Sequence, residues 1–217
     1  MNIRIIIIVI LIGVVILIVL RRNTETTDSH SQLKDESERQ HIKTANSIFY
    51  HEDDYLQVEI IPSDNFDELI KQAENVQDFA EKHFDGGGYT DIMVREENGV
   101  KLKEREIKPK ELDLILSELP IRKCTDVSTG IRPGEIKSKN TYGYGENYNG
   151  IFFNFNSNSV TGIWIAGSPN IEDKILVKIL NDIGKKWSLL LMDWNSLELV
   201  DLKDKEQIEK YLKDLLK

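Results

Sequence analysis

The chain begins with an apolar run from Ile5 to Leu20 that contains neither a charge nor a proline. As a helix, this run spans roughly 24 Å, against roughly 30 Å for the hydrocarbon core of a bilayer. Arginines flank it on both sides and can reach the two interfaces. No small-residue cleavage site of the kind that ends a signal peptide follows it. The pattern therefore predicts one uncleaved transmembrane helix, a signal-anchor within residues 1–22.

This anchor predicts a single-pass protein of the bacterial cytoplasmic (inner) membrane, with residues 5–20 in contact with lipid. The bacterial source is suggested by the high content of Ile, Lys and Asn. Positive charge marks the cytoplasmic side of a membrane helix. Because Arg4 precedes the run whereas Arg21 and Arg22 follow it, the sequence leaves open on which side the C-terminal domain lies.

After the run, residues 23–47 are almost entirely polar and predict a linker. From Ile48 onward the pattern is that of a folded domain. Residues 55–61 alternate between polar and apolar, which predicts a strand with one buried face. Apolar residues then recur at spacings of three and four from Phe66 to Phe84, which predicts an amphipathic helix.

An Asn-Gly pair at 98–99 is typical of a tight hairpin, so we predict paired strands at 90–95 and 100–104. The same periodicities predict, in chain order, a helix at 109–119, a strand at 122–127, a hairpin at 151–155 and 160–166, a helix at 175–183, a central strand at 187–194, a strand at 197–202 and a helix at 208–216. Residues 128–150 predict a long loop. This order predicts an α+β domain over 48–217, with a mixed or antiparallel sheet and helices packed mainly on one face.

The net charge of −9 narrows the range of partners. Residues 48–217 carry −10, because Arg4 contributes +1 and the five basic and five acidic residues of 21–47 balance. Nucleic-acid binding rests on a basic footprint, so no nucleic-acid partner is expected. An acidic domain suits a protein partner with a basic surface, although simple solubility explains the same charge.

The segment with the most distinctive composition contains Tyr142, Tyr144 and Tyr148, which are spaced by Gly and Asn. This mixture is typical of adaptable protein-contact surfaces, so the three tyrosines are the candidate binding residues. A mobile connector whose tyrosines pack locally explains the same pattern. Nearby acids such as Glu135 and Glu146 leave another interpretation open, in which residues 128–150 build the site of a hydrolase or small-molecule enzyme.

Three other clusters give weaker signals. Residues 51–54 are four successive metal-binding types, but neighbouring strand residues point to opposite faces. The glycine-rich residues 85–91 lack the lysine of a phosphate-binding loop and precede a predicted strand rather than a helix. Cys124, the single cysteine, cannot form an intrachain disulfide and lies in no catalytic motif. No catalytic residue, metal site or cofactor is therefore predicted.

Residues 51–97 combine an acidic lead-in, a strand ending in Ile-Ile-Pro, an amphipathic helix, a glycine turn and Tyr-Thr-Asp-Ile-Met-Val-Arg at 89–95. This combination resembles small acidic bacterial immunity proteins of polymorphic toxin systems. The resemblance implies a protein that binds a toxin and masks a basic patch on it. The leading hypothesis is thus a membrane-anchored protein that binds another protein. The alternatives are a cell-envelope hydrolase or small-molecule enzyme, and a purely structural envelope protein.

Overall fold

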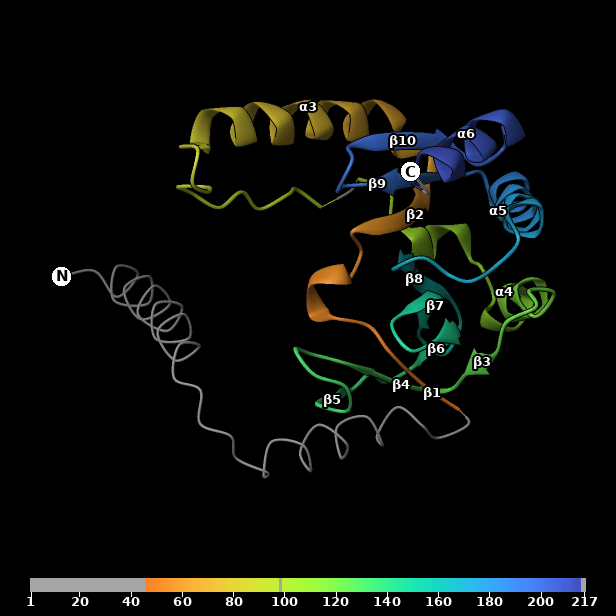
Figure 1. Ribbon diagram of the computed structural model, residues 1–217. Coiled ribbons are helices and arrows are strands. Elements are labelled where there is room, and N and C mark those ends of the chain that lie inside the picture. The colour runs from red at the N-terminus through yellow and green to blue at the C-terminus, as the bar shows by residue number, and fades with distance from the viewer. Residues whose placement is uncertain (1–45, 98, 216–217) are drawn as a thin grey trace, which may run out of the picture. The chain divides into compact units, whose positions relative to one another are not determined.

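The fold is built on a seven-stranded antiparallel sheet. A computed structural model describes residues 46–97 and 99–215, which belong to one compact unit. Within it the strands lie in the order β10-β9-β2-β8-β7-β6-β3 (Figure 1). Their bounds are β2 (Val58–Pro62), β3 (Lys123–Cys124), β6 (Thr141–Glu146), β7 (Asn149–Phe155), β8 (Val160–Ala166), β9 (Leu189–Asp193) and β10 (Glu198–Asp201). All five residues of β9 are buried, which confirms the central strand predicted at 187–194.

The two faces of this sheet carry different layers. Three α-helices and a short 3-10 helix pack on one face, around a large apolar core; they are α4 (Pro109–Leu116), α5 (Asp173–Trp187), α6 (Lys205–Leu215) and η3 (Leu102–Arg105). On the other face, helix α3 (Phe66–His83) packs over β9 through Leu69, which contacts a cluster that includes Met192. Because helices cover both faces of the sheet, the central strands are buried on both sides, and their sequences are continuous apolar runs.

A second, three-stranded sheet covers the α3 side of the main sheet near β7 and β8. It consists of β1 (Ser47–Phe49), β4 (Asp126–Thr129) and β5 (Ile136–Lys137), with β1 and β4 parallel. A β-carbon on Gly143 of β6 would lie 2.7 Å from Cγ2 of Ile48 in β1. Glycine at 143 therefore lets the two sheets approach each other closely. The long loop predicted at 128–150 is wrong, because most of this range forms β4, β5, β6 and the start of β7.

The predicted transmembrane helix within residues 1–22, and the linker at 23–47 except its last two residues, lie outside the described residues. Within 46–97 and 99–215, no helix is long and apolar enough to cross a membrane. Helix α3, with 18 residues, carries charges in every turn. The predicted fold class is corrected accordingly, to an α+β fold without a membrane-spanning helix among its described residues. The correction extends to the single-pass, signal-anchor topology, which rests on such a helix.

The hairpin predicted from the Asn-Gly pair is also wrong. Residues 92–97 form no strand, and residues 102–105 form the 3-10 helix η3. The backbone N–H of Val100 donates to Oδ1 of Asn65, and its carbonyl accepts from Nδ2 of Asn65, both at 2.9 Å. Because a buried side chain from the start of α3 satisfies Val100, this residue has no backbone groups left for a partner strand.

Candidate functional site

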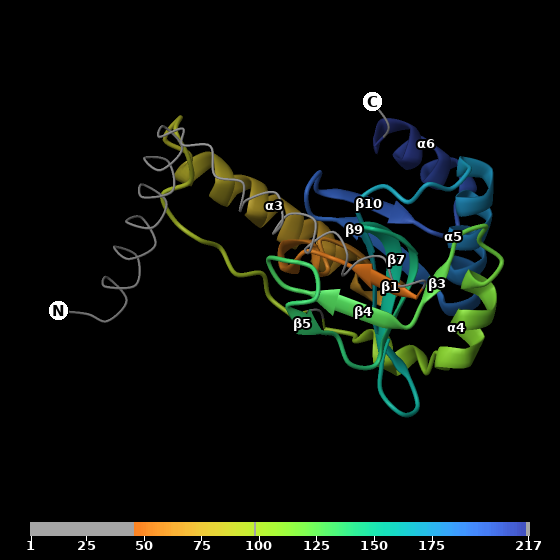
Figure 2. The ribbon, with the colours of Figure 1, turned by 60° about the horizontal axis from the view of Figure 1, so that its bottom comes forward.

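Helix α3 runs beyond the cluster that holds its first half. Val76 is the last of its residues that packs there. Residues 77–97, called the arm from here on, comprise the second half of α3, the glycine turn, and a segment that runs back toward the body (Figures 1 and 2). The arm is therefore continuous with the fold at both ends but lies largely outside its core.

The far end of the arm is closed by local contacts. The backbone N–H of Thr90 donates to the carbonyl of His83 at 2.8 Å, and the rings of Phe84 and Tyr89 lie 5.5 Å apart. Oδ1 of Asp85 accepts from the N–H groups of Gly87 and Gly88, and these two hydrogen bonds lower the pKa of Asp85. The glycine-rich stretch is thus a turn that ends the helix, a position where glycine is common.

The returning segment of the arm exposes apolar side chains. Ile92 is 86% exposed and Val94 is 85% exposed. Met93, which lies between them, and Arg95, which follows, are half-buried. This alternation has the period of two that is characteristic of a strand with one inward face. Among the described residues, no backbone-to-backbone hydrogen bond reaches 91–97. The segment is therefore strand-like in pattern but unpaired.

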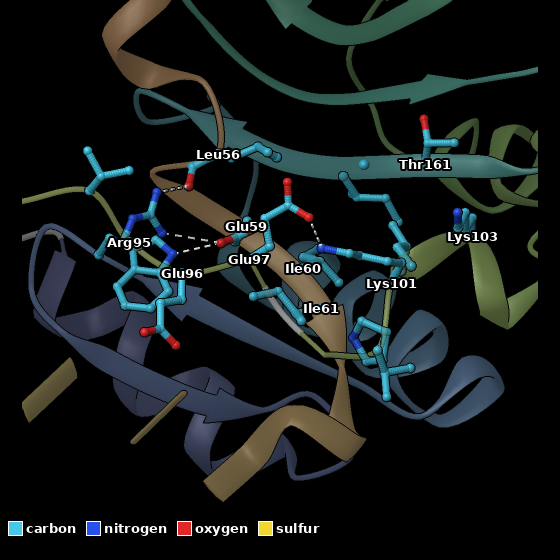
Figure 3. Close-up of a pocket in the computed structure, with 17 residues that line it drawn as sticks. Leu56, Glu59, Ile60, Ile61, Arg95, Glu96, Glu97, Lys101, Lys103 and Thr161 are labelled. Carbon is cyan, nitrogen blue, oxygen red and sulfur yellow. Dashed lines mark hydrogen bonds and ion pairs between the residues drawn. The ribbon is translucent and has the colours of Figure 1, made fainter. Parts of the chain in front are cut away.

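Arg95 fastens this segment to the body (Figure 3). Its Nη1 lies 3.4 Å from Oε1 of Glu59 on β2, and its Nη2 donates to the carbonyl of Leu56 at 3.5 Å. The guanidinium carbon also lies 4.1 Å from the ring centroid of Trp194, which follows β9. The indole N–H of Trp194 donates to the same Glu59 oxygen at 2.7 Å. One carboxylate thus joins the arm to two neighbouring strands.

A pocket of about 620 Å³ lies beside this junction. Strands β2 and β8 pair only at Val58 and Glu59, so the sheet opens beyond these residues. Ile60 of β2 and Ile163 of β8 line the opening, and residues 94–97 and 100–103 form another wall. Figure 3 shows Glu97 and Lys101 pointing toward each other, and their charged groups lie 2.6 Å apart. The pocket is an open cleft with both charges and apolar side chains.

Burial dominates the electrostatics of the Glu59–Arg95 pair. The side chain of Glu59 is 13% exposed and that of Arg95 is 29% exposed. Burial raises the pKa of Glu59 in spite of the hydrogen bond from Trp194 and the charge of Arg95, which both lower it. Burial likewise lowers the pKa of Arg95 against the effect of Glu59. Desolvation of the pair thus outweighs its attraction, which is common for buried ion pairs.

This balance predicts a pH dependence of stability. Because the pKa of Glu59 is higher in the folded protein than the 4.5 of a free glutamate, its contribution to stability is fully present below pH 4.5 and is lost as the pH rises through the folded pKa. We expect the free energy of unfolding of wild type to fall relative to Glu59→Gln as the pH rises above 4.5, and the difference then to level off. Urea unfolding between pH 4 and 8 measures it.

The control for this measurement is Glu97→Gln. Hydrogen bonding to Lys101 lowers the pKa of Glu97, so its contribution has the opposite sign and is lost as the pH falls. Glu97 is fully exposed, and the change in the profile should be slight. A difference between wild type and Glu59→Gln that does not vary with pH would contradict the raised pKa.

The three tyrosines predicted as binding residues do not form one surface. Tyr144 is 1% exposed, and its hydroxyl donates to Asp113 under helix α4. Tyr142 is half-buried on the same face of β6. Tyr148 is exposed in the turn after β6 and packs edge-on against Phe49 of the second sheet. Tyr144 is therefore closed to a partner, and Tyr148 offers the most accessible ring of the three.

The acids named for an enzymatic site are also separated. Oε2 of Glu135 accepts the backbone N–H groups of Ile131 and Arg132, at 2.9 and 3.1 Å, so it stabilises a turn. Glu146 lines a small cleft beside Arg122 at the edge of the main sheet. None of the described pockets includes both acids. Cys124 is buried and its thiol points at the carbonyl of Ser47, as in a structural role.

Comparison with protein-family models, with curated proteins and with solved structures finds no match to this chain. The properties of the site therefore rest on its own geometry. Sequence reasoning missed the arm because a period-2 pattern followed by Asn-Gly predicts a paired hairpin. One signal in the sequence could have revealed the arm. The apolar positions of the helix continue to Phe84, beyond Val76, the last helix residue that packs against the cluster formed with β9 and β10.

Proposed function

We propose that this protein acts by binding another protein, and that the arm is its contact surface. The observation that carries the proposal is the exposure of Ile92 and Val94 on a segment that Arg95 holds against the body. Exposed apolar side chains that gather on one segment are typical of protein-contact sites. Phe84 and Tyr89 add two exposed rings at the tip of the same arm.

The charge of the arm favours a basic partner. Residues 77–97 contain six acidic and two basic side chains, a large share of the net charge of −9. Like-signed charge of this density accelerates association with an oppositely charged surface and discourages contact with other acidic proteins. The apolar side chains then supply most of the affinity, since exposed charges contribute little net binding energy. An immunity-type role, in which the arm covers a basic patch of a toxin, is one form of this function.

Site-specific photocrosslinking tests the proposal. The photoreactive residue p-benzoylphenylalanine replaces Ile92 in the full chain, in cells that express the protein naturally. The matched control replaces Leu114, which is 71% exposed on helix α4 and lies outside the arm. We expect a defined crosslinked product at position 92 and not at 114, which mass spectrometry identifies.

The captured protein is then purified and titrated calorimetrically with the full chain. A direct complex that weakens as salt is raised supports the proposal, because the charge of the arm contributes to it. Equal crosslinking at both positions, or no complex between the purified proteins, would overturn the arm as the binding surface.

A further inference from the structure

The unpaired segment of the arm has the two features that a sheet needs in order to add a strand. Its side chains alternate, with Ile92 and Val94 outward and Met93 and Arg95 inward. Its backbone donors and acceptors make no backbone hydrogen bonds within the described residues. Among the residues that the structure describes, one backbone N–H of this stretch has a side-chain partner, and it is local: the N–H of Ile92 donates to Oδ1 of Asp91 at 2.8 Å.

We infer that the arm binds its partner by strand addition: an edge strand of a basic protein pairs with residues 91–96 through backbone hydrogen bonds. This inference rests on the proposed function and specifies its geometry. Strand addition of this kind obtains affinity from the backbone and specificity from alternate side chains. The added strand places apolar residues opposite Ile92 and Val94, and a basic residue opposite Glu96.

The charges along the segment favour a basic partner strand over a second copy of this chain. An exposed edge is a hazard for self-association, and acidic side chains beside it oppose pairing between two copies. Asp91 and Glu96 lie within the segment, and the arm as a whole is acidic. Two such arms side by side repel each other, whereas a strand that carries lysine or arginine is attracted. The partner is therefore a basic edge strand and not a second copy of this chain.

Arg95 holds the segment in place before a partner strand binds. Its contacts with Glu59, the Leu56 carbonyl and Trp194 fix the inward side of the segment. A strand that is already held in place loses little conformational entropy when a partner pairs with it. On the outward side, Ile92 and Val94 are exposed, and the backbone of the segment makes no backbone hydrogen bond within the described residues.

A designed peptide tests the inference. The probe is a fluorescein-labelled hexapeptide, Lys-Thr-Val-Thr-Val-Lys, amidated at its C-terminus and titrated with the full chain by fluorescence anisotropy. Paired antiparallel, it sets its valines opposite Val94 and Ile92 and its lysines opposite Glu96 and Asp91. Two matched versions are N-methylated, one on both valines and the other on both threonines, so that each loses the N–H donors of one edge.

Strand addition uses one edge of the peptide only, because its valines must share a face with Ile92 and Val94. We expect the unmodified peptide and one methylated version to bind, and the other methylated version to bind at least about tenfold more weakly through loss of two hydrogen bonds. A version with glutamate in place of lysine should not bind. Equal binding of both methylated peptides, or no binding of the unmodified one, would overturn strand addition.

These results separate the inference from the proposed function. A protein captured at position 92 by crosslinking, combined with equal binding of the methylated peptides, leaves protein binding through the arm in place and removes the strand geometry. Analytical ultracentrifugation of the full chain tests whether a second copy of this chain is the partner instead. A dimer that Ile92→Ser dissociates would make a second copy the partner and would overturn the inference.

Discussion

With Ile92 and Val94 both replaced by serine, we expect the affinity of the chain for its protein partner to fall by about 100-fold. Burying an aliphatic side chain of this size contributes about 1.5–3 kcal/mol. If a partner covers each side chain only in part, the two together contribute about 3 kcal/mol, which corresponds to about two powers of ten in Kd. Calorimetric titration of the captured partner with wild type and variant measures the loss.

The same double substitution should leave the fold almost unchanged, because both side chains are already more than four-fifths exposed. Exposed substitutions of this kind shift stability by less than about 0.5 kcal/mol. Leu114→Ser and Ile136→Ser are the matched controls, since both positions are exposed and lie outside the arm. Full retention of affinity in the double variant would contradict the role of the arm, and an equal loss in the controls would show that the effect is not local.

Replacing Arg95 by methionine should release the arm from the body. The substitution keeps an unbranched side chain without the charge, and it leaves Glu59 in a largely buried position with only the Trp194 N–H as partner. Removing one member of a buried pair costs about 3–5 kcal/mol, and we expect about 2 kcal/mol here because Arg95 is 29% exposed. Where cleavage follows the opening equilibrium, this corresponds to roughly 30-fold faster proteolysis within residues 89–97.

Limited proteolysis with mass-spectrometric mapping measures this release. Lys101→Met is the control, because the Lys101–Glu97 pair is solvent-exposed and exposed ion pairs of this kind add little to stability. The double variant Arg95→Met, Glu59→Gln should recover part of the stability, since it no longer buries an unpaired carboxylate. Cleavage of Arg95→Met at the rate of wild type would contradict the fastening role of Arg95.

Most of the secondary structure could be predicted from local periodicity. The helix predicted at 66–84 forms over 66–83, the hairpin around residues 156–159 forms as predicted, and the buried strand predicted at 187–194 forms over 189–193. The helix predicted at 175–183 continues through Gly184 to Trp187, because Gly184 fits against the backbone of Leu202 where a β-carbon would not. These elements follow the sequence because their own burial pattern sets their period.

The errors arise where a distant residue decides the local structure. Asn65 satisfies the backbone of Val100 and thereby prevents the hairpin that Asn-Gly predicts. Gly143 looks like a loop residue, yet it lies in a strand that Ile48 of another layer approaches closely. Neither contact leaves a periodic signal, so single-sequence reasoning misses both.

The candidate site was only partly predictable. The acidic charge, on which the proposed basic partner rests, follows from composition. The tyrosines at 142, 144 and 148 are predicted as binding residues because their spacing by Gly and Asn is typical of adaptable contact surfaces. In the structure these glycines serve close packing, and the tyrosines at 142 and 144 face the helices. The exposed residues lie instead at 92 and 94, where alternation suggested a half-buried strand.

The central place of β2 in the sheet also bears on how the protein is made. Glu59 of β2 pairs with Trp164 and Met192, and it bonds Trp194 at a separation of 135 positions along the chain. A ribosome therefore releases β2 and the whole arm long before either neighbouring strand exists. Such non-local pairing slows folding and leaves apolar segments open to chaperones and proteases during synthesis. Translation that stops before β9 yields a chain without the strand that pairs with all five residues of β2, whereas β8 pairs with only Val58 and Glu59. We expect such a fragment to be degraded rather than to persist as a smaller folded protein.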